Sequence, residues 1–129
     1  MNRPQQRQLA KPATKELLCL QKWEEMTDWF LDTSSRWPKS VRFTLTQRLQ
    51  NHVLDVLELL VEVRYQPKKR STGLNEVNLR LTRIRYLLRL VHKRQISSTR
   101  SFEFAMRQID EVGRMLHGWG EQVKKKAVS

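Results

Sequence analysis

The sequence has little of what interrupts or cross-links a chain. Among its 129 residues are four glycines, four prolines and a single cysteine. The scarcity of glycine and proline argues against a turn-rich β fold and favours long helices. Because Cys19 has no second cysteine to pair with, an intramolecular disulfide is impossible, and this predicts a reducing, cytoplasmic location.

Acidic residues are also few. The chain has 13 aspartates and glutamates against 25 lysines and arginines, so its formal net charge is +12. Such an excess repels itself in a compact fold, and a polyanion would relieve the repulsion. Nucleic acid is therefore the expected partner. An anionic membrane surface, or a soluble basic protein with no such partner, are the alternatives.

Long apolar runs and targeting signals are missing as well. The best run, residues 56–61, is interrupted by Glu58 and is far shorter than a membrane span. The first 15 residues are polar and charged, without the apolar segment of a signal peptide. We therefore expect no membrane association, and we expect residues 1–12 to be a flexible tail.

The residue patterns of catalytic and metal sites do not occur. The three histidines, His52, His92 and His117, fall in three different predicted helices, without a Glu-x-x-His motif. No zinc-ligand spacing, phosphate-binding loop or dinucleotide fingerprint is present. We predict no enzyme, no metal and no cofactor. His52 is expected to be a hydrogen-bonded core residue and Cys19 a small buried or half-buried one.

Four stretches have helical periodicity: residues 14–35, 39–65, 73–95 and 99–125. Thr14 can cap the first, and Ser97, Ser98 or Thr99 the last. The last two stretches carry unbroken apolar stripes with steps of three and four. These are Leu74, Val77, Leu81, Ile84, Leu88 and Val91, then Phe102, Ala105, Ile109, Val112, Leu116, Trp119 and Val123. The sequence predicts an all-α antiparallel four-helix bundle over residues 13–126.

Two glycine-containing segments need an interpretation. Residues 68–73 are predicted to form a basic turn between the second and third helices. Gly113, Gly118 and Gly120 fall inside the fourth helix, where each costs about 1 kcal/mol relative to alanine. Close approach of another helix would explain them, or the helix ends near Gly118.

Charge is distributed unevenly along the chain. Residues 68–100 contain ten basic residues and only Glu76 as an acid, a net charge of +9, whereas residues 16–32 have five acids and one lysine, a net charge of −4. Arginine binds phosphate through a bidentate fork, and the usual base-reading motifs are absent, so we expect contacts to backbone phosphates. The candidate binding residues are Lys68, Lys69, Arg70, Arg80, Arg83, Arg85, Arg89, Lys93 and Arg94. Some of them could instead contact neighbouring subunits head to tail.

Two short motifs resemble known families. Residues 37–43 (WPKSVRF) resemble the start of the second helix in ribosomal RNA intervening-sequence proteins. Residues 109–119 (IDEVGRMLHGW) resemble the last helix of the accessory variability determinant, Avd, of diversity-generating retroelements. These families are related four-helix bundles, and the length and basicity of this chain are closer to Avd.

The Avd resemblance implies a homopentameric barrel of four-helix subunits without catalytic residues. It also implies binding to the reverse transcriptase of the retroelement and to RNA or DNA through a basic surface. That complex copies a template RNA with errors at adenines, and the cDNA then rewrites a variable gene. The alternatives are an intervening-sequence-type protein, a stand-alone nucleic-acid-binding bundle, or a structural oligomer whose charges serve subunit contacts.

Overall fold

The computed structural model describes residues 14–128, with side chains through residue 121. No strand occurs in this part of the chain, so the predicted all-α class is confirmed for it. The predicted tail, residues 1–12, and the side chain of Val123 lie outside the described residues. Four helices correspond to the four predicted stretches: α2 (Lys15–Ser34), α3 (Gln47–Tyr65), α4 (Arg70–Lys93) and α5 (Thr99–Val128).

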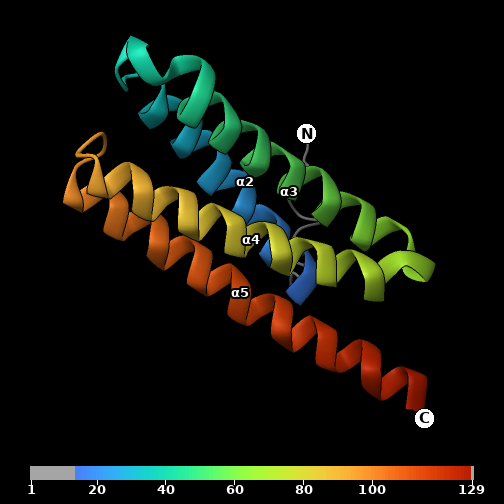
Figure 1. Ribbon diagram of the computed structural model, residues 1–129. Helices are drawn as coiled ribbons and strands as arrows, with labels where there is room; N and C mark the ends of the chain where they lie inside the picture. Colours follow the sequence, from blue (N-terminus) through green and yellow to red (C-terminus); the bar gives the residue numbers. More distant parts are fainter. Residues whose placement is uncertain (1–13, 129) are drawn as a thin grey trace, which may run out of the picture.

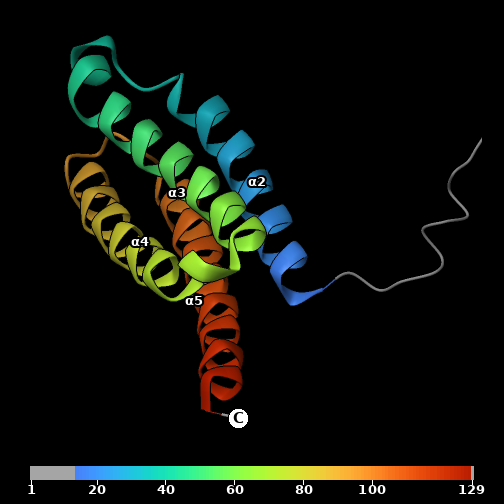
Figure 2. The same ribbon diagram turned by 90° about the vertical axis from the view of Figure 1, so that its right-hand side faces the viewer.

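The four helices form an antiparallel bundle (Figure 1). Helix α2 packs against α3 and α5, and α4 packs against the same two helices, so α2 and α4 lie diagonally opposite each other. The α2–α3 and α4–α5 connections meet at one end of the bundle, and the α3–α4 turn lies at the other. The last turns of α5 project beyond the other helices (Figure 2).

The predicted apolar stripes meet along the axis of the bundle. Every predicted stripe residue of α4 is buried, as are those of α5 from Ala105 to Trp119. Helix α2 contributes Trp23, whose indole Nε1 donates a 2.9 Å hydrogen bond to the carbonyl oxygen of Val53 in α3. Because a buried indole N–H needs an acceptor, this bond fixes the register of α2 against α3.

Polar side chains satisfy the backbone groups at the helix ends. The Thr14 hydroxyl accepts a 3.2 Å hydrogen bond from the N–H of Leu17, which confirms the predicted cap of α2. The Ser98 hydroxyl accepts a 3.1 Å bond from the N–H of Ser101, so it is the member of the predicted serine–threonine set that caps α5. Each cap satisfies one of the free N–H groups of a first helical turn.

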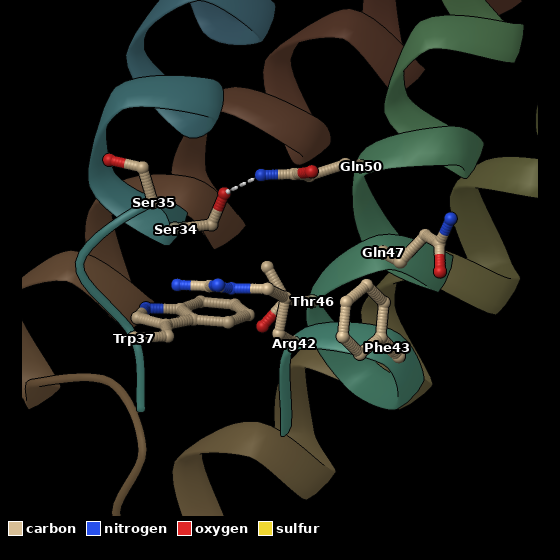
Figure 3. Close-up of a pocket in the computed structure, with 8 residues that line it drawn as sticks. All are labelled: Ser34, Ser35, Trp37, Arg42, Phe43, Thr46, Gln47 and Gln50. Atoms are coloured by element: carbon tan, nitrogen blue, oxygen red, sulfur yellow. Dashed lines mark hydrogen bonds between the residues drawn. The ribbon is translucent and has the colours of Figure 1, made fainter. Parts of the chain in front are cut away.

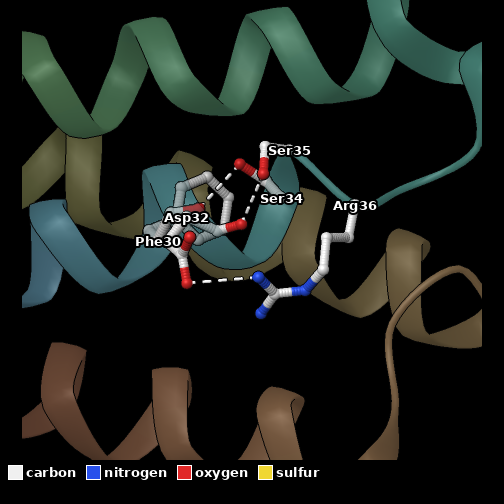
Figure 4. Close-up of polar contacts among 5 residues, drawn as sticks. All are labelled: Phe30, Asp32, Ser34, Ser35 and Arg36. Atoms are coloured by element: carbon white, nitrogen blue, oxygen red, sulfur yellow. Dashed lines mark hydrogen bonds and ion pairs between the residues drawn. The ribbon is translucent and has the colours of Figure 1, made fainter.

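The last turn of α2 is held by hydroxyl groups (Figure 4). Ser34 donates to the carbonyl oxygen of Phe30 at 2.7 Å, and Ser35 donates to that of Asp32 at 2.6 Å. Just beyond the helix, the Arg36 guanidinium lies 3.2 Å from the Asp32 carboxylate. These contacts end α2 before Pro38, which has no N–H with which to continue a helix.

The second predicted helix begins irregularly. A 3₁₀ turn, η1 (Lys39–Val41), is followed by a π-helical turn, η2 (Arg42–Thr46), and only then by regular α-helix. Helical periodicity in the sequence does not distinguish these turns from an α-helix, because the apolar spacing continues through them. The π turn places Phe43 outside the core, where its exposed fraction is 80%.

The prediction of a basic turn over residues 68–73 is wrong. A short 3₁₀ turn, η3 (Pro67–Lys69), leads directly into α4 at Arg70, so Gly73 lies inside the helix. A β-carbon at Gly73 would collide with Cγ2 of Val63, a buried residue of α3. The glycine therefore permits close approach of α3 and α4 beside their turn, and it does not mark the turn itself.

The glycines of α5 also differ from expectation. The helix continues to Val128, so the predicted end near Gly118 is wrong. A β-carbon at Gly113 would lie 3.2 Å from Nη2 of Arg85, so the neighbour there is a side chain and not a helix backbone. Gly118 and Gly120 face open space, and close packing does not explain them.

The α4–α5 connection turns at Gln95, which has a left-handed backbone with φ of 60°. The N–H of Ile96 donates to the carbonyl oxygen of Val91 at 3.0 Å, the pattern of a Schellman helix ending. Glycine normally fills this position, because a side chain with a β-carbon is strained there.

We therefore expect Gln95→Gly to raise the free energy of unfolding by about 1 kcal/mol, measured by urea denaturation. Arg94→Gly is the control, because Arg94 has φ of −82° and glycine there only adds entropy to the unfolded chain. Equal destabilisation by both substitutions would contradict the strain at Gln95.

Candidate nucleic-acid interface

Opposite charges lie on diagonally opposite helices. The exposed face of α2 carries an acidic stripe, which consists of Glu24, Glu25, Asp28 and Asp32. Helix α4, which α3 and α5 separate from α2, carries six basic residues and one acid, Glu76, a net charge of +5. The acidic stripe therefore cannot neutralise α4 within one chain.

Two predicted binding residues are committed to ion pairs within the chain. Arg80 Nη1 lies 3.2 Å from Asp55 of α3, and its Nε lies 3.0 Å from Glu76 without hydrogen-bond geometry. On the other edge of α4, Arg85 Nε lies 3.3 Å from Asp110 of α5. Both arginine side chains are only 25% exposed. They join α4 to its two neighbours and are poorly placed to bind a phosphate chain.

Three more predicted residues lie at the far end of the bundle. Arg70 donates hydrogen bonds to the carbonyl oxygens of Val63 and Arg64, each at 3.2 Å. Its guanidinium therefore satisfies carbonyl groups in the last turn of α3. Lys69 lies 3.6 Å from Glu62, whereas Lys68 is exposed. Helix α4 has 24 residues and spans about 36 Å, so this group is remote from the basic residues at its other end.

The remaining predicted residues are exposed and lack a carboxylate partner among the described residues. They are Arg83, Arg89, Lys93 and Arg94. The Arg89 guanidinium lies over the Tyr86 ring, with its carbon 5.0 Å from the ring centroid. A cation held over an aromatic ring keeps its charge and its outward N–H groups for a ligand.

Sequence reasoning missed two cations, one in the π turn before α3 and one in the first turn of α3. Arg42 and Arg48 are exposed, and neither forms an ion pair with a described carboxylate. The signal that could have found them is the stretch of residues 33–54, which holds four basic residues and no acid. Together with the four cations above they form what we term the basic end, made of Arg42, Arg48, Arg83, Arg89, Lys93 and Arg94.

The pKa of His52 reflects the positive electrostatic potential at this surface. It is half-buried, its Nδ1 has no hydrogen-bond partner, and the prediction of a hydrogen-bonded core residue is therefore wrong. Burial lowers the pKa of His52 below its usual 6.5, as do Arg80 and Arg83 of α4 and Arg48 of α3, while Asp55 opposes them. Like charge from two helices thus converges at this imidazole.

Other reactive groups show no arrangement for chemistry in the described part of the chain. Cys19 is fully buried, as predicted, and burial raises the pKa of its thiol to about 11. No cluster of three or more histidine, cysteine, aspartate or glutamate residues that could hold a metal occurs there. No helix in that part is long and apolar enough to cross a membrane.

Comparison with known proteins identifies the family. The model of the bAvd-like family matches residues 17–123. The chain belongs to the bAvd-like family. The match runs from the first turn of α2 into α5, so this bAvd-like chain aligns with its family over all four helices of the bundle. Among curated proteins, none matches it at a significant level.

The lowered pKa of His52 has a consequence for stability. As the pH falls from about 7.5 to about 5.5, the unfolded chain takes up a proton at its ordinary pKa before the folded chain does, so folding is destabilised. We expect His52→Gln to lose less stability than the wild type over this range, measured by urea denaturation. The same pH dependence in both proteins would show that His52 is not the group responsible.

Proposed function

We propose that this protein is a non-catalytic accessory subunit of a diversity-generating retroelement. It binds the element's reverse transcriptase and nucleic acid through the basic end, and so supports mutagenic cDNA synthesis and retrohoming. Membership of the bAvd-like family supports the accessory role. The observation that carries the nucleic-acid contact is that the unpaired, exposed cations of the basic end come from both α4 and the start of α3, where Arg48 and Arg83 act together on His52.

The charge of the basic end is best explained by a partner with repeated negative charges. Arg89 and Lys93 are four residues apart on α4, a spacing at which like charges destabilise a helix slightly. A phosphate backbone would offset that cost and release its condensed counterions on binding. Because such contacts carry no sequence information, binding through this surface is expected to be largely sequence-independent.

A homopentameric ring, the assembly that the resemblance to Avd implies, is part of the same proposal. The acidic stripe of α2 and the cations of α4 face away from each other, so the two faces of one subunit complement those of its neighbours. Head-to-tail contacts of this kind close into a ring when the rotation between copies permits it. The same observation favours a second candidate function, a structural oligomer whose charges serve only subunit contacts.

The salt dependence of nucleic-acid binding distinguishes a nucleic-acid-binding subunit from a purely structural oligomer. We expect Arg89→Gln, Lys93→Gln and Arg94→Gln, combined, to reduce the slope of log affinity against log salt by about 2 to 3, at roughly 0.7–0.9 per phosphate contact. Fluorescence anisotropy with a labelled oligonucleotide at several salt concentrations measures this slope.

A control variant with the same net charge replaces Lys15, Lys22 and Arg107, which lie on α2 and α5, by glutamine. We expect it to keep most of the wild-type slope. Equal slopes in the wild type and in the triple variant of Arg89, Lys93 and Arg94 would show that the basic end is not the contact surface. Dissociation of the oligomer at high salt, with no nucleic-acid retention at any salt, would favour the structural oligomer.

Association with the reverse transcriptase separates the retroelement role from a stand-alone or intervening-sequence-type bundle. We expect a reverse transcriptase of the same element to co-purify with this protein at moderate salt, and to do so less when Arg89, Lys93 and Arg94 are replaced. The charge-matched control should co-purify as the wild type does. Absence of association for the wild type would contradict the accessory role.

A further inference from the structure

A hollow of about 360 Å³ opens at the basic end, between the end of α2 and the π turn (Figure 3). Trp37 forms one side of it and Phe43 the other, with Arg42 and Thr46 between them. Ligand sites commonly have volumes of about 300–1,000 Å³, so the hollow is large enough for one nucleobase and its sugar.

The polar groups that line this hollow are not all satisfied. Thr46 is only 6% exposed, yet its Oγ1 has no hydrogen-bond partner. Gln50 Nε2 donates a 2.8 Å hydrogen bond to Ser34 Oγ, which orients the Gln50 amide at the wall. An unpaired buried hydroxyl costs about 1–3 kcal/mol, so a ligand that pairs with it would gain affinity there.

Phe43 separates this hollow from a second one. The second hollow, of about 270 Å³, is lined by Arg48, Asn51, His52 and Asp55, and the two hollows share Phe43 and Gln47. A single exposed apolar residue is ordinary. Here the exposed ring forms a ridge between two hollows, and a π turn, a form often found at functional sites, holds it there.

We propose that this ridge binds unpaired nucleotides of single-stranded RNA or DNA. One base stacks on Phe43, its neighbours enter the two hollows, and Arg42 and Arg48 contact the flanking phosphates. The inference rests on the proposed nucleic-acid function and narrows it, because bases in a duplex are already stacked and cannot reach the ring.

The chemistry of the site favours a nucleotide over an aliphatic side chain or a lipid. A base has a π face for Phe43 and Trp37, and its edge has donors and acceptors for Thr46 and Gln50. The phosphates match the exposed guanidinium groups of Arg42 and Arg48. An aliphatic ligand would leave the Thr46 hydroxyl unpaired and would give the two arginines no partner.

The first test compares single strands with a duplex by fluorescence anisotropy, using labelled oligouridylate, oligothymidylate and a DNA duplex. We expect Phe43→Ala to weaken binding of both single strands by roughly 5- to 150-fold, the range for losing one stacked base. Duplex binding should change by less than about twofold. Phe43→Tyr should restore single-strand binding, because the ring is retained.

Tyr65→Ala is the matched control, because Tyr65 is also exposed, at 68%, but lies at the other end of α3. It should bind single strands as the wild type does. A second, positive readout uses an oligothymidylate with 5-iodouracil. Ultraviolet crosslinking should join the base to the tryptic peptide of residues 43–48, which contains Phe43 and lacks any other aromatic residue.

Unchanged single-strand binding by Phe43→Ala, or crosslinks confined to other peptides, would overturn the site. A change in sedimentation of Phe43→Ala, with equal losses for single strands and duplex, would overturn it in favour of a subunit contact. The triple variant of Arg89, Lys93 and Arg94 could reduce the slope of log affinity against log salt while Phe43→Ala has no effect on binding. In that case the proposed nucleic-acid function stands and only this site is wrong. If the wild type binds neither single strands nor duplex, both fail.

Discussion

The diagonal placement of α2 and α4 is the constraint on which the surface of this protein depends. Each helix of this antiparallel bundle packs mainly against its two neighbours, and α2 and α4 lie across the axis from each other. The acidic stripe of α2 and the cations of α4 therefore point in opposite directions. The positive charge of α4 is therefore not offset by the acidic helix of the same chain.

The same arrangement of helices determines which arginines form ion pairs within the chain and which can bind an anionic partner. Carboxylates of neighbouring helices reach α4 at its two edges, from Asp55 of α3 to Arg80 and from Asp110 of α5 to Arg85. The cations that point towards solvent or lie near the α4–α5 connection have no carboxylate partner among the described residues. The division between structural and available cations thus follows from position on the helix, and not from residue type.

Much of the fold could be predicted from the sequence because it is set by local periodicity and capping. The apolar stripes of α4 and α5 fixed the buried face of each helix, and Thr14 marked the start of α2. The role of Gly73 could not be predicted, because it depends on Val63 of another helix. The π turn was also missed, since its apolar spacing is that of an α-helix.

The candidate site was less predictable than the fold, since it depends on tertiary neighbours. A charge count along the chain cannot tell a paired arginine such as Arg80 from an exposed one such as Arg89. It also grouped Lys68 with Arg94, although a helix of 24 residues separates them. Arg42 and Arg48 were overlooked because they precede the most basic segment, although the chain near them contains no acid.

Hydroxyl-radical footprinting of the protein, free and bound to a single-stranded oligonucleotide, would show whether nucleic acid contacts the basic end. It reports the solvent exposure of individual aromatic and aliphatic side chains on every face in one experiment. We expect the oligonucleotide to protect Phe43 and Tyr86 and to leave Leu18 and Tyr65, which are also exposed, as reactive as before. Protection of Leu18 or Tyr65, with Phe43 and Tyr86 unchanged, would contradict it.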